Sequence, residues 1–318
     1  VGWGGANSAS AVGLEAMSLN IAGSAFTRKT ELIVNHKRYL SGSDIGINTF
    51  GFSQRVGETS VLALSIMSID LGDIDVTTVD NPAGKLATFS PTLTIMDAGF
   101  AKNFSNSISG GIGLRVISEA LANVSSRGYA FDAGIRYVAG ENDEIKFGIA
   151  LKNVGPTMKY SGDGLSFFAA TQNAFGNDVF ATNDHRAAEF QLPSLLNIGA
   201  SYDFYLSPRM DTATEKITAD HIITGAINFT SNSFTKDQYR FGAEYSYKKM
   251  FMVRAGYVLE QGTWFSSANR TAASIGPSFG ASFIAPLGKN GSTLGFNYAY
   301  ELTENFSGTH SIGIRLDL

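Results

Sequence analysis

Apolar and polar residues alternate with a period of two along most of the 318-residue chain. In residues 308–318, for example, every second residue from Ile312 to Leu318 is large and apolar. This period is typical of β-strands that bury one face only. The pattern predicts an all-β chain of about fourteen strands: 30–38, 44–54, 58–69, 92–104, 107–118, 127–138, 143–153, 194–205, 217–229, 236–247, 250–260, 271–285, 292–302 and 308–318.

The length of these segments indicates where the apolar face lies. Most contain about ten residues, the length with which a tilted strand crosses the hydrocarbon core of a bilayer. Strands of soluble β-proteins are usually shorter, about 5–6 residues. A transmembrane antiparallel β-barrel is therefore expected. The facing of the second and third segments stays open, because Phe50 and Phe52 are in phase with Asn48 and Gln54.

The connections between the expected strands differ in length on the two sides. One set is mostly short: 56–57, 105–106, 140–143, 206–216, 248–249 and 288–291. The other set contains several long loops: 39–43, 70–91, 119–126, 154–193, 230–235, 261–270 and 303–307. Bacterial outer-membrane barrels have short periplasmic turns and longer external loops. This predicts a barrel in the lipid bilayer of a Gram-negative outer membrane, with both chain ends in the periplasm.

The composition agrees with a barrel and narrows the function. Charged residues make up 16%, below the roughly 25% of soluble proteins. No apolar stretch reaches the ~20 residues of a spanning helix. The net charge of −4 gives no support for nucleic-acid binding. Residues 1–28 are rich in Gly, Ala and Ser, and we expect them to precede the barrel (29–318) and to fold inside it as a partial plug.

Charged residues within the expected strands should face the lumen, because a charge facing lipid costs several kcal/mol near the midplane. Two interpretations stay open, a selective pore and a ladder of salt bridges that fills the barrel. The mixture of both signs favours the ladder. Across the turn at 248–249, Glu244 should face Arg254. The expected lumen charges are Arg115, Asp132, Arg136, Lys146, Lys152, Asp203, Arg240, Glu244, Arg254, Glu260, Glu301, Arg315 and Asp317.

Catalytic and metal-binding patterns are weak. Asp70, Asp73, Asp75 and Asp80 lie in one loop, but their spacing matches no EF-hand, so a solvated loop is expected. The four histidines are scattered, the chain has no cysteine, and no GxSxG motif occurs. We therefore expect no enzymatic activity, no cofactor and no metal.

The 154–193 connection contains aromatic residues among Gly, Asn and Asp. Structureless loops longer than about 15 residues are usually functional or disordered, and exposed aromatics are frequent binding anchors. We expect this loop to bind a partner, with the 261–270 loop as a second candidate; a lid over the barrel's own mouth is the alternative. The expected anchors are Phe167, Phe168, Phe175, Phe180, Trp264 and Phe265.

Several short motifs resemble the PorV/PorQ family, which belongs to the wider group of barrels similar to the fatty-acid transporter FadL. They are Gly4–Ser10, Gly13–Ala16, Asn20–Gly23, Leu151–Gly155, Leu192–Gly199 and Gly308–Gly313. Ile21 stands where that family usually has proline. The resemblance implies a FadL-like fold and a role in the type IX secretion system of Bacteroidota. There the chain would bind the large translocon barrel and the C-terminal signal domains of exported proteins, as an adaptor or shuttle.

Two functions remain after the sequence has been considered. The first is a protein-binding subunit of that secretion system, and the alternative is a FadL-like channel for hydrophobic small molecules. Such a channel needs a continuous apolar path. Because the lumen is expected to be charged, the sequence favours the secretion subunit.

Overall fold

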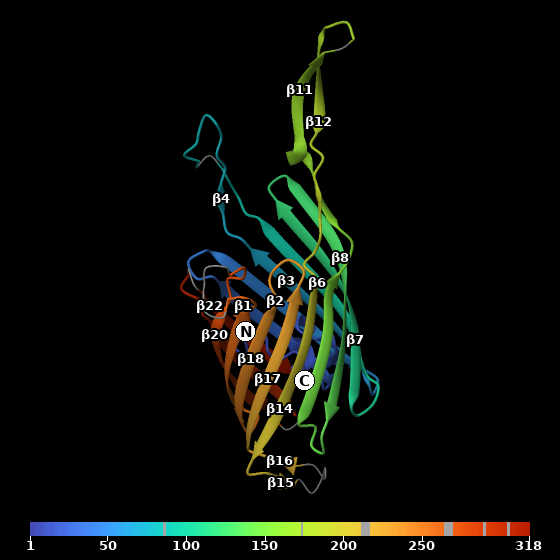
Figure 1. Cartoon of the computed structure of the whole chain (residues 1–318), viewed down its shortest axis with the longest axis vertical. Helices are drawn as coiled ribbons and strands as arrows, with labels where there is room; N and C mark the ends of the chain where they lie inside the picture. Colours follow the sequence, from blue (N-terminus) through green and yellow to red (C-terminus); the bar gives the residue numbers. More distant parts are fainter. Residues whose placement is uncertain (85–86, 173, 211–216, 264–269, 289–290, 304–305) are drawn as a thin grey trace.

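The computed structural model describes residues 1–84, 87–172, 174–210, 217–263, 270–288, 291–303 and 306–318. These residues form a closed barrel of fourteen antiparallel strands (Figure 1). The barrel strands are β1 (Thr30–Tyr39), β2 (Ile45–Val56), β3 (Ser60–Asp70), β6 (Thr92–Asn103), β7 (Ile108–Leu121), β8 (Val124–Ala139), β9 (Ile145–Val154), β14 (Leu195–Leu206), β17 (His221–Asn232), β18 (Gln238–Tyr247), β19 (Phe251–Glu260), β20 (Gly276–Leu287), β21 (Ser292–Glu301) and β22 (Thr309–Asp317).

The barrel closes between its first and last strands. β1 pairs with β22 from Glu31–Asp317 to Arg38–His310, and every other neighbour along the wall is the next barrel strand in the sequence. Closure leaves no strand edge unpaired, which a lipid environment requires because it offers the backbone no water. The predicted all-β barrel of about fourteen strands is confirmed.

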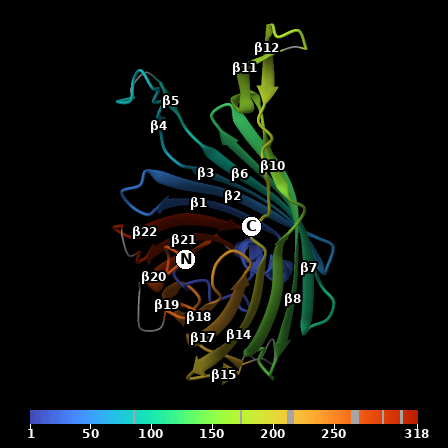
Figure 2. The ribbon, with the colours of Figure 1, turned by 45° about the horizontal axis from the view of Figure 1, so that its top comes forward.

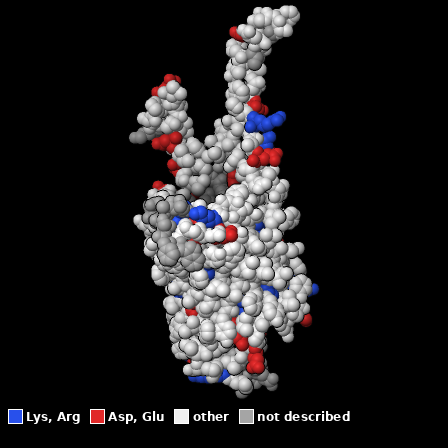
Figure 3. All heavy atoms as spheres, viewed as in Figure 1, with Lys and Arg blue, Asp and Glu red and all other residues white. Residues whose placement is uncertain are grey.

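The outer wall is apolar and the inner wall is small, polar or charged. Along β8, for example, Phe131 and Ile135 are 62% and 61% exposed, whereas Asp132 and Arg136, the residues that follow them, are buried. Charged side chains are sparse over the barrel wall in Figure 3 and gather toward its two ends. This is the surface of a barrel whose outside faces lipid. No helix among the described residues is long and apolar enough to cross a membrane.

The two ends of the barrel differ. The turn end holds the β2–β3, β6–β7, β8–β9, β14–β17, β18–β19 and β20–β21 connections, and the loop end holds the other seven. Short hairpins extend both ends, and Figures 1 and 2 show that β11–β12 stands farthest beyond the loop end. The additional strands are β4 (Ile74–Asp75), β5 (Thr88–Phe89), β10 (Met158–Ser161), β11 (Ser166–Gln172), β12 (Asp178–Asp184), β13 (Glu189–Phe190), β15 (Arg209–Met210) and β16 (Ile217–Thr218).

Three expected boundaries were wrong. The 119–126 connection is only the tight turn at Ala122 and Asn123, because β7 and β8 continue their pairing beyond the expected ends. The segments expected to begin at 217 and 271 begin at His221 and Gly276. The 154–193 connection is not structureless, since β11 and β12 pair over seven residues each. Residues 166–172 read SFFAATQ, without a one-sided alternation that would have predicted a strand.

The N-terminal segment, residues 1–28, lies inside the barrel, where it forms the 3-10 helices η1 (Gly13–Ser18) and η2 (Ile21–Phe26) (Figure 2). Its close packing requires glycine on the inner wall. A Cβ on Gly134 would lie 2.1 Å from Asn20 Oδ1, and one on Gly256 would lie 2.3 Å from the Trp3 carbonyl carbon. The inner-wall glycines in such contact are Gly51, Gly99, Gly111, Gly113, Gly134, Gly148, Gly199, Gly242, Gly256 and Gly280.

Candidate functional site: the barrel lumen

Ion pairs connect neighbouring strands across the inner wall. Arg115 Nε donates to Asp97 Oδ1 at 2.6 Å, and its Nη2 lies 3.3 Å from Asp132 Oδ2. Lys152 Nζ lies 3.8 Å from the same Asp132 oxygen. Asp97 connects β6 to this cluster, although the sequence analysis did not select it. Its signal was its position in phase with the inward-facing small residues of residues 92–104.

Other lumen charges form separate pairs. Glu244 and Arg254 are opposite each other in β18 and β19 and form a hydrogen-bonded ion pair, which confirms the pairing expected from the turn. Arg315 donates to Asp317 at 2.8 Å and lies 3.8 Å from Glu31. Mixed pairs of this kind fix the register of the wall and fill the lumen.

Two cations bind the N-terminal segment instead. Arg136 Nε donates to the Ala9 carbonyl at 2.7 Å, and Lys152 Nζ donates to the carbonyls of Met17 and Ser18. Arg240 lies against Gly5 and donates to Gln238 at 2.7 Å. Seven of the expected lumen charges thus lie on the inner wall and divide between wall ion pairs and contacts with residues 1–28: Arg115, Asp132, Arg136, Arg240, Glu244, Arg254 and Arg315.

A β-bulge aims two successive residues into the lumen. The β8–β9 register shifts between Phe131 and Ala133, and Asn153 adopts a positive φ of 59°. As a result Lys152 reaches η1 while Asn153 Oδ1 accepts a hydrogen bond from Arg115. Bulges commonly redirect side chains in this way next to functional sites.

A cavity of about 480 Å³ lies beside η1, within the roughly 300–1,000 Å³ of ligand pockets. Asn35, Thr49 and Met67 of its lining lie on the loop-end side of the wall residues that contact Leu14. The remaining lining combines apolar and polar residues: Val1, Gly2, Trp3, Gly5, Asn7, Leu14, Glu15, Met17, Ser18, Leu19, Ile33, Gly51, Ser65, Asp97, Arg115, Lys152, Arg254, Asn297, Tyr298, Ala299, Ser311 and Gly313. The cavity is therefore amphipathic.

Toward the loop end, four neighbouring strands reverse their polarity. Nearer the turn end, Phe50, Ile66 and Met96 face outward and are exposed. Two residues closer to the loop end, the outward residues of these strands are polar: Asn48, Ser68, Thr94 and Ser118. The inward residues become apolar, and cross-strand pairs join them into what we call the inner apolar patch: Ile47, Met67, Ile69, Leu93, Ile95 and Ile117.

The inner apolar patch continues to the cavity, because Met67 belongs to both. At its other edge, Met158 of β10 packs over Gly128, opposite Ile117. The lumen is therefore charged in one part and apolar in another, whereas the sequence had predicted a charged lumen. The signal that could have found the patch is that both alternating sets of residues 61–69 contain several large apolar side chains, and that Leu93 and Ile95 are on the face opposite Met96. A lipid-facing wall alone does not require apolar residues on both faces.

The expected partner-binding residues lie outside the barrel or outside the described residues. Phe168 and Phe180 stack in the β11–β12 hairpin, with ring centroids 5.4 Å apart, and Phe167 stacks on His185. Contrary to the expectation, these three phenylalanines lie in strands. Phe175, at the turn between them, is 90% exposed. Trp264 and Phe265 fall outside the described residues.

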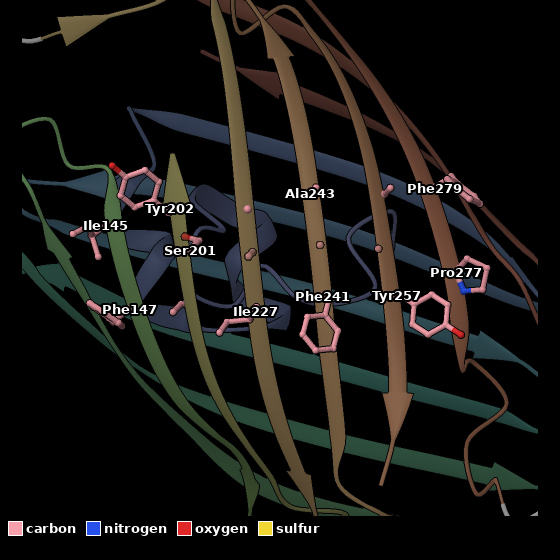
Figure 4. Close-up of a pocket in the computed structure, with 16 residues that line it drawn as sticks. Ile145, Phe147, Ser201, Tyr202, Ile227, Phe241, Ala243, Tyr257, Pro277 and Phe279 are labelled. Carbon is pink, nitrogen blue, oxygen red and sulfur yellow. The ribbon is translucent and has the colours of Figure 1, made fainter. Parts of the chain in front are cut away.

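A second hollow is a groove of about 860 Å³ on the outer wall. Its floor is formed by small residues that are opposite one another in three neighbouring strands, Gly225, Ala243 and Ala255. Figure 4 shows Ile227, Phe241 and Tyr257 along one side of it, while the N-terminal segment lies behind the strands. Because it opens outward, it is separate from the lumen. Among the described residues, no group of three His, Asp or Glu side chains could hold a metal ion.

Comparisons with solved structures show which known barrels this chain is similar to. No protein-family model and no curated protein matches it. It is similar over 99% of its length to 94% of the CymD monoaromatic hydrocarbon channel, with 13% identity and a TM-score of 0.60. The fold is FadL-like. The toluene transporter TodX of Pseudomonas putida (97% and 93% of the two chains, 12% identity, TM-score 0.56) and a FadL homologue of Pseudomonas aeruginosa (99% and 96%, 11% identity, TM-score 0.52) share it.

This FadL-like barrel is thus shown at the level of fold. The sequence identities are too low to carry a function across, so its function depends on the lumen described above.

Proposed function

We propose that the chain is an outer-membrane channel for small hydrophobic molecules. The observation that carries this proposal is the inner apolar patch, which leads from the loop end to the cavity beside η1. Two barrels of the same fold are named as a monoaromatic hydrocarbon channel and a toluene transporter, which supports the same conclusion. The sequence had favoured the secretion subunit because the patch was not recognised.

The polarity reversal explains how such a channel would work. Where the outer surface of β2, β3, β6 and β7 becomes polar, the wall leaves the hydrocarbon and its apolar face turns to the lumen. A hydrophobic solute arriving from water would bury apolar surface against the patch. This burial is favourable by about 25 cal/mol per Å² of apolar surface. The cavity would then hold it above the N-terminal segment. In this arrangement the loop end faces the outside and the end of β22 faces the periplasm, whereas Val1 lies in the lumen beside the cavity and not in the periplasm as the sequence had predicted.

The test is uptake of radiolabelled toluene by cells of a host strain that lacks barrels of this kind. Ile69→Asn with Leu93→Asn would make the patch polar and should reduce uptake at least severalfold. The matched control is Ser68→Asn with Thr94→Asn, which alters the outer side of the same two strands. Equal uptake by both double variants and the unchanged chain, at equal amounts of folded barrel, would overturn the proposal.

A protein-binding role of the β11–β12 hairpin is a second candidate. An isolated two-stranded hairpin is only marginally stable in water, yet Phe168, Phe175 and Phe180 are 70%, 90% and 62% exposed on this one. A partner that covers these rings would stabilise it. Only the sequence resemblance suggests that the partner is a translocon barrel or the signal domains of secreted cargo. The proposal that the chain has no enzymatic activity rests on the sequence patterns alone.

Replacing Phe167, Phe168, Phe175 and Phe180 with Ser tests this second role. The barrel should still fold, because the hairpin lies outside its wall. Truncating an aromatic hot spot typically costs at least ~2 kcal/mol of binding free energy, which is about thirtyfold in affinity. Much less of a bound protein should therefore be recovered from solubilised membranes. Unchanged recovery and unchanged toluene uptake would leave the hairpin without a binding role.

A further inference from the structure

The β11–β12 hairpin is a two-stranded sheet with an open edge on each strand. The strands pair over seven residues, from Ser166–Asp184 to Gln172–Asp178, and no third strand joins them among the residues that the structure describes. Every second residue of β11 directs its N–H and C=O at β12, so the residues between them direct theirs outward. Figures 1 and 2 show that this hairpin stands apart from the barrel wall.

The edge of β11 lacks the features that usually keep sheet edges from pairing. Proteins protect an open edge with charged residues, proline or a bulge. β11 contains no charged residue and no proline, and its pairing with β12 shows no register shift. β12, by contrast, has an aspartate at each end. Uncharged segments of this length on an exposed edge promote aggregation, and a strand that covers β11 would remove that hazard.

A second copy of the chain in the same membrane fits this edge poorly. Both copies would have their loop ends on the same side, so a two-fold axis between them would lie along the membrane normal. β11 would then run in the same direction in both hairpins, and the two edges would pair as parallel strands. Parallel pairing is the less stable arrangement and occurs where both faces of a sheet are covered. On this hairpin both faces are exposed, since Phe167 and Phe168 lie on opposite faces and are both exposed.

We propose that β11 binds an extended, uncharged segment of another protein as a third, antiparallel strand. Main-chain hydrogen bonds would supply affinity, and alternate side chains of the segment would contact the two faces of the hairpin. On one face they would lie beside Phe168, which stacks on Phe180, and on the other beside Phe167 and Ala169. This inference rests on the protein-binding role given above as the second candidate, and it specifies how the partner binds.

An uncharged copy of β12 is the probe for this edge, because β12 already pairs antiparallel with β11. The fluorescein-labelled peptide contains residues 178–184 with Asp178→Asn and Asp184→Asn, and fluorescence anisotropy measures its binding to the full chain in micelles. Two further peptides are N-methylated at every second residue, in either of the two registers. One of them should bind like the unmodified peptide and the other at least about tenfold more weakly, because only one register removes donors that face β11.

Ala169→Pro and Ala170→Pro are a matched pair in the chain itself. Adjacent residues of a strand direct their N–H groups to opposite edges, so one proline removes a donor from the hairpin and the other removes a donor from the open edge. The variant whose hairpin stays resistant to chymotrypsin should bind the unmodified peptide at least about tenfold more weakly than the unchanged chain. Both variants should keep toluene uptake, because the hairpin lies outside the barrel wall.

Equal affinity of the two N-methylated peptides would overturn the proposal, since binding would then depend on side chains alone. Unchanged affinity of the proline variant with the intact hairpin would overturn it as well. If the unmodified peptide does not bind to the unchanged chain, strand addition fails. The protein-binding role is then still decided separately, by recovery of a bound protein with the four phenylalanines replaced by Ser.

Discussion

Among the described residues, Asp132 holds together the largest ion-pair cluster of the lumen, so its replacement offers a quantitative test of the structure. The carboxylate is buried, accepts the Asn153 N–H at 2.8 Å, and lies near Arg115 and Lys152. Asp132→Asn keeps the shape and an acceptor but leaves the buried Lys152 and the partly buried Arg115 without this counter-charge.

Removing one partner of a buried ion pair costs about 3–5 kcal/mol. Because the asparagine still accepts from Asn153, and Asp97 still binds Arg115, we expect the lower end, about 3 kcal/mol. With a urea slope of roughly 3 kcal/mol per M, the unfolding midpoint should fall by about 1 M. Lys152 also binds the carbonyls of η1, so the N-terminal segment should loosen together with the wall.

The assay is urea unfolding in detergent micelles, followed by Trp3 fluorescence in the Trp264→Phe background. Asp80→Asn, at an exposed loop position, is the control and should not shift the midpoint. An Asp132→Asn midpoint that coincides with that of the control would refute the reasoning. It would mean that the cluster is hydrated and contributes nothing net.

Three further predictions address the wall and the lumen. Ile66→Arg should destabilise the barrel by about 2–4 kcal/mol and Ser68→Arg by about 1 kcal/mol or less, because the outer surface turns polar between them; equal losses of unfolding free energy would place the boundary elsewhere. A double-mutant cycle at Glu244 and Arg254 should give a coupling of about 0.2–1 kcal/mol, and a coupling of zero would contradict the ion pair. Planar-bilayer recordings should show little conductance for the full chain and stable conductance once residues 1–28 are deleted, whereas large stable currents from the full chain would show that the lumen is open.

Much of the wall could be predicted from period-two alternation. A strand in lipid must be apolar outside, and a charge on that face is costly, so the alternation alone places Arg115, Asp132 and Arg254 inside. Turn geometry then fixes the register across a tight turn, which is why the Glu244–Arg254 pair could be named. The number of strands and the closed barrel follow from the same reasoning.

Alternation fails where both faces of a strand are apolar. In β3 and β6 it groups residues correctly but does not tell which group is inside. The inner apolar patch was missed for this reason, and with it the channel function. The β11–β12 hairpin was missed for a related reason. It stands beyond the barrel wall, so no lipid contacts one of its faces and its sequence does not need to alternate.

The sequence by itself determined the local period, and through it the strand count and the facing of charged positions. The reason is that each charged side chain facing lipid costs free energy, whatever the rest of the fold. Only the tertiary structure decided which groups meet across the lumen. The contacts of Asn20 with Gly134, of Lys152 with η1 and of Arg136 with Ala9 join the wall to the segment inside the barrel. Closure of the wall brings them together, and no local pattern records that geometry.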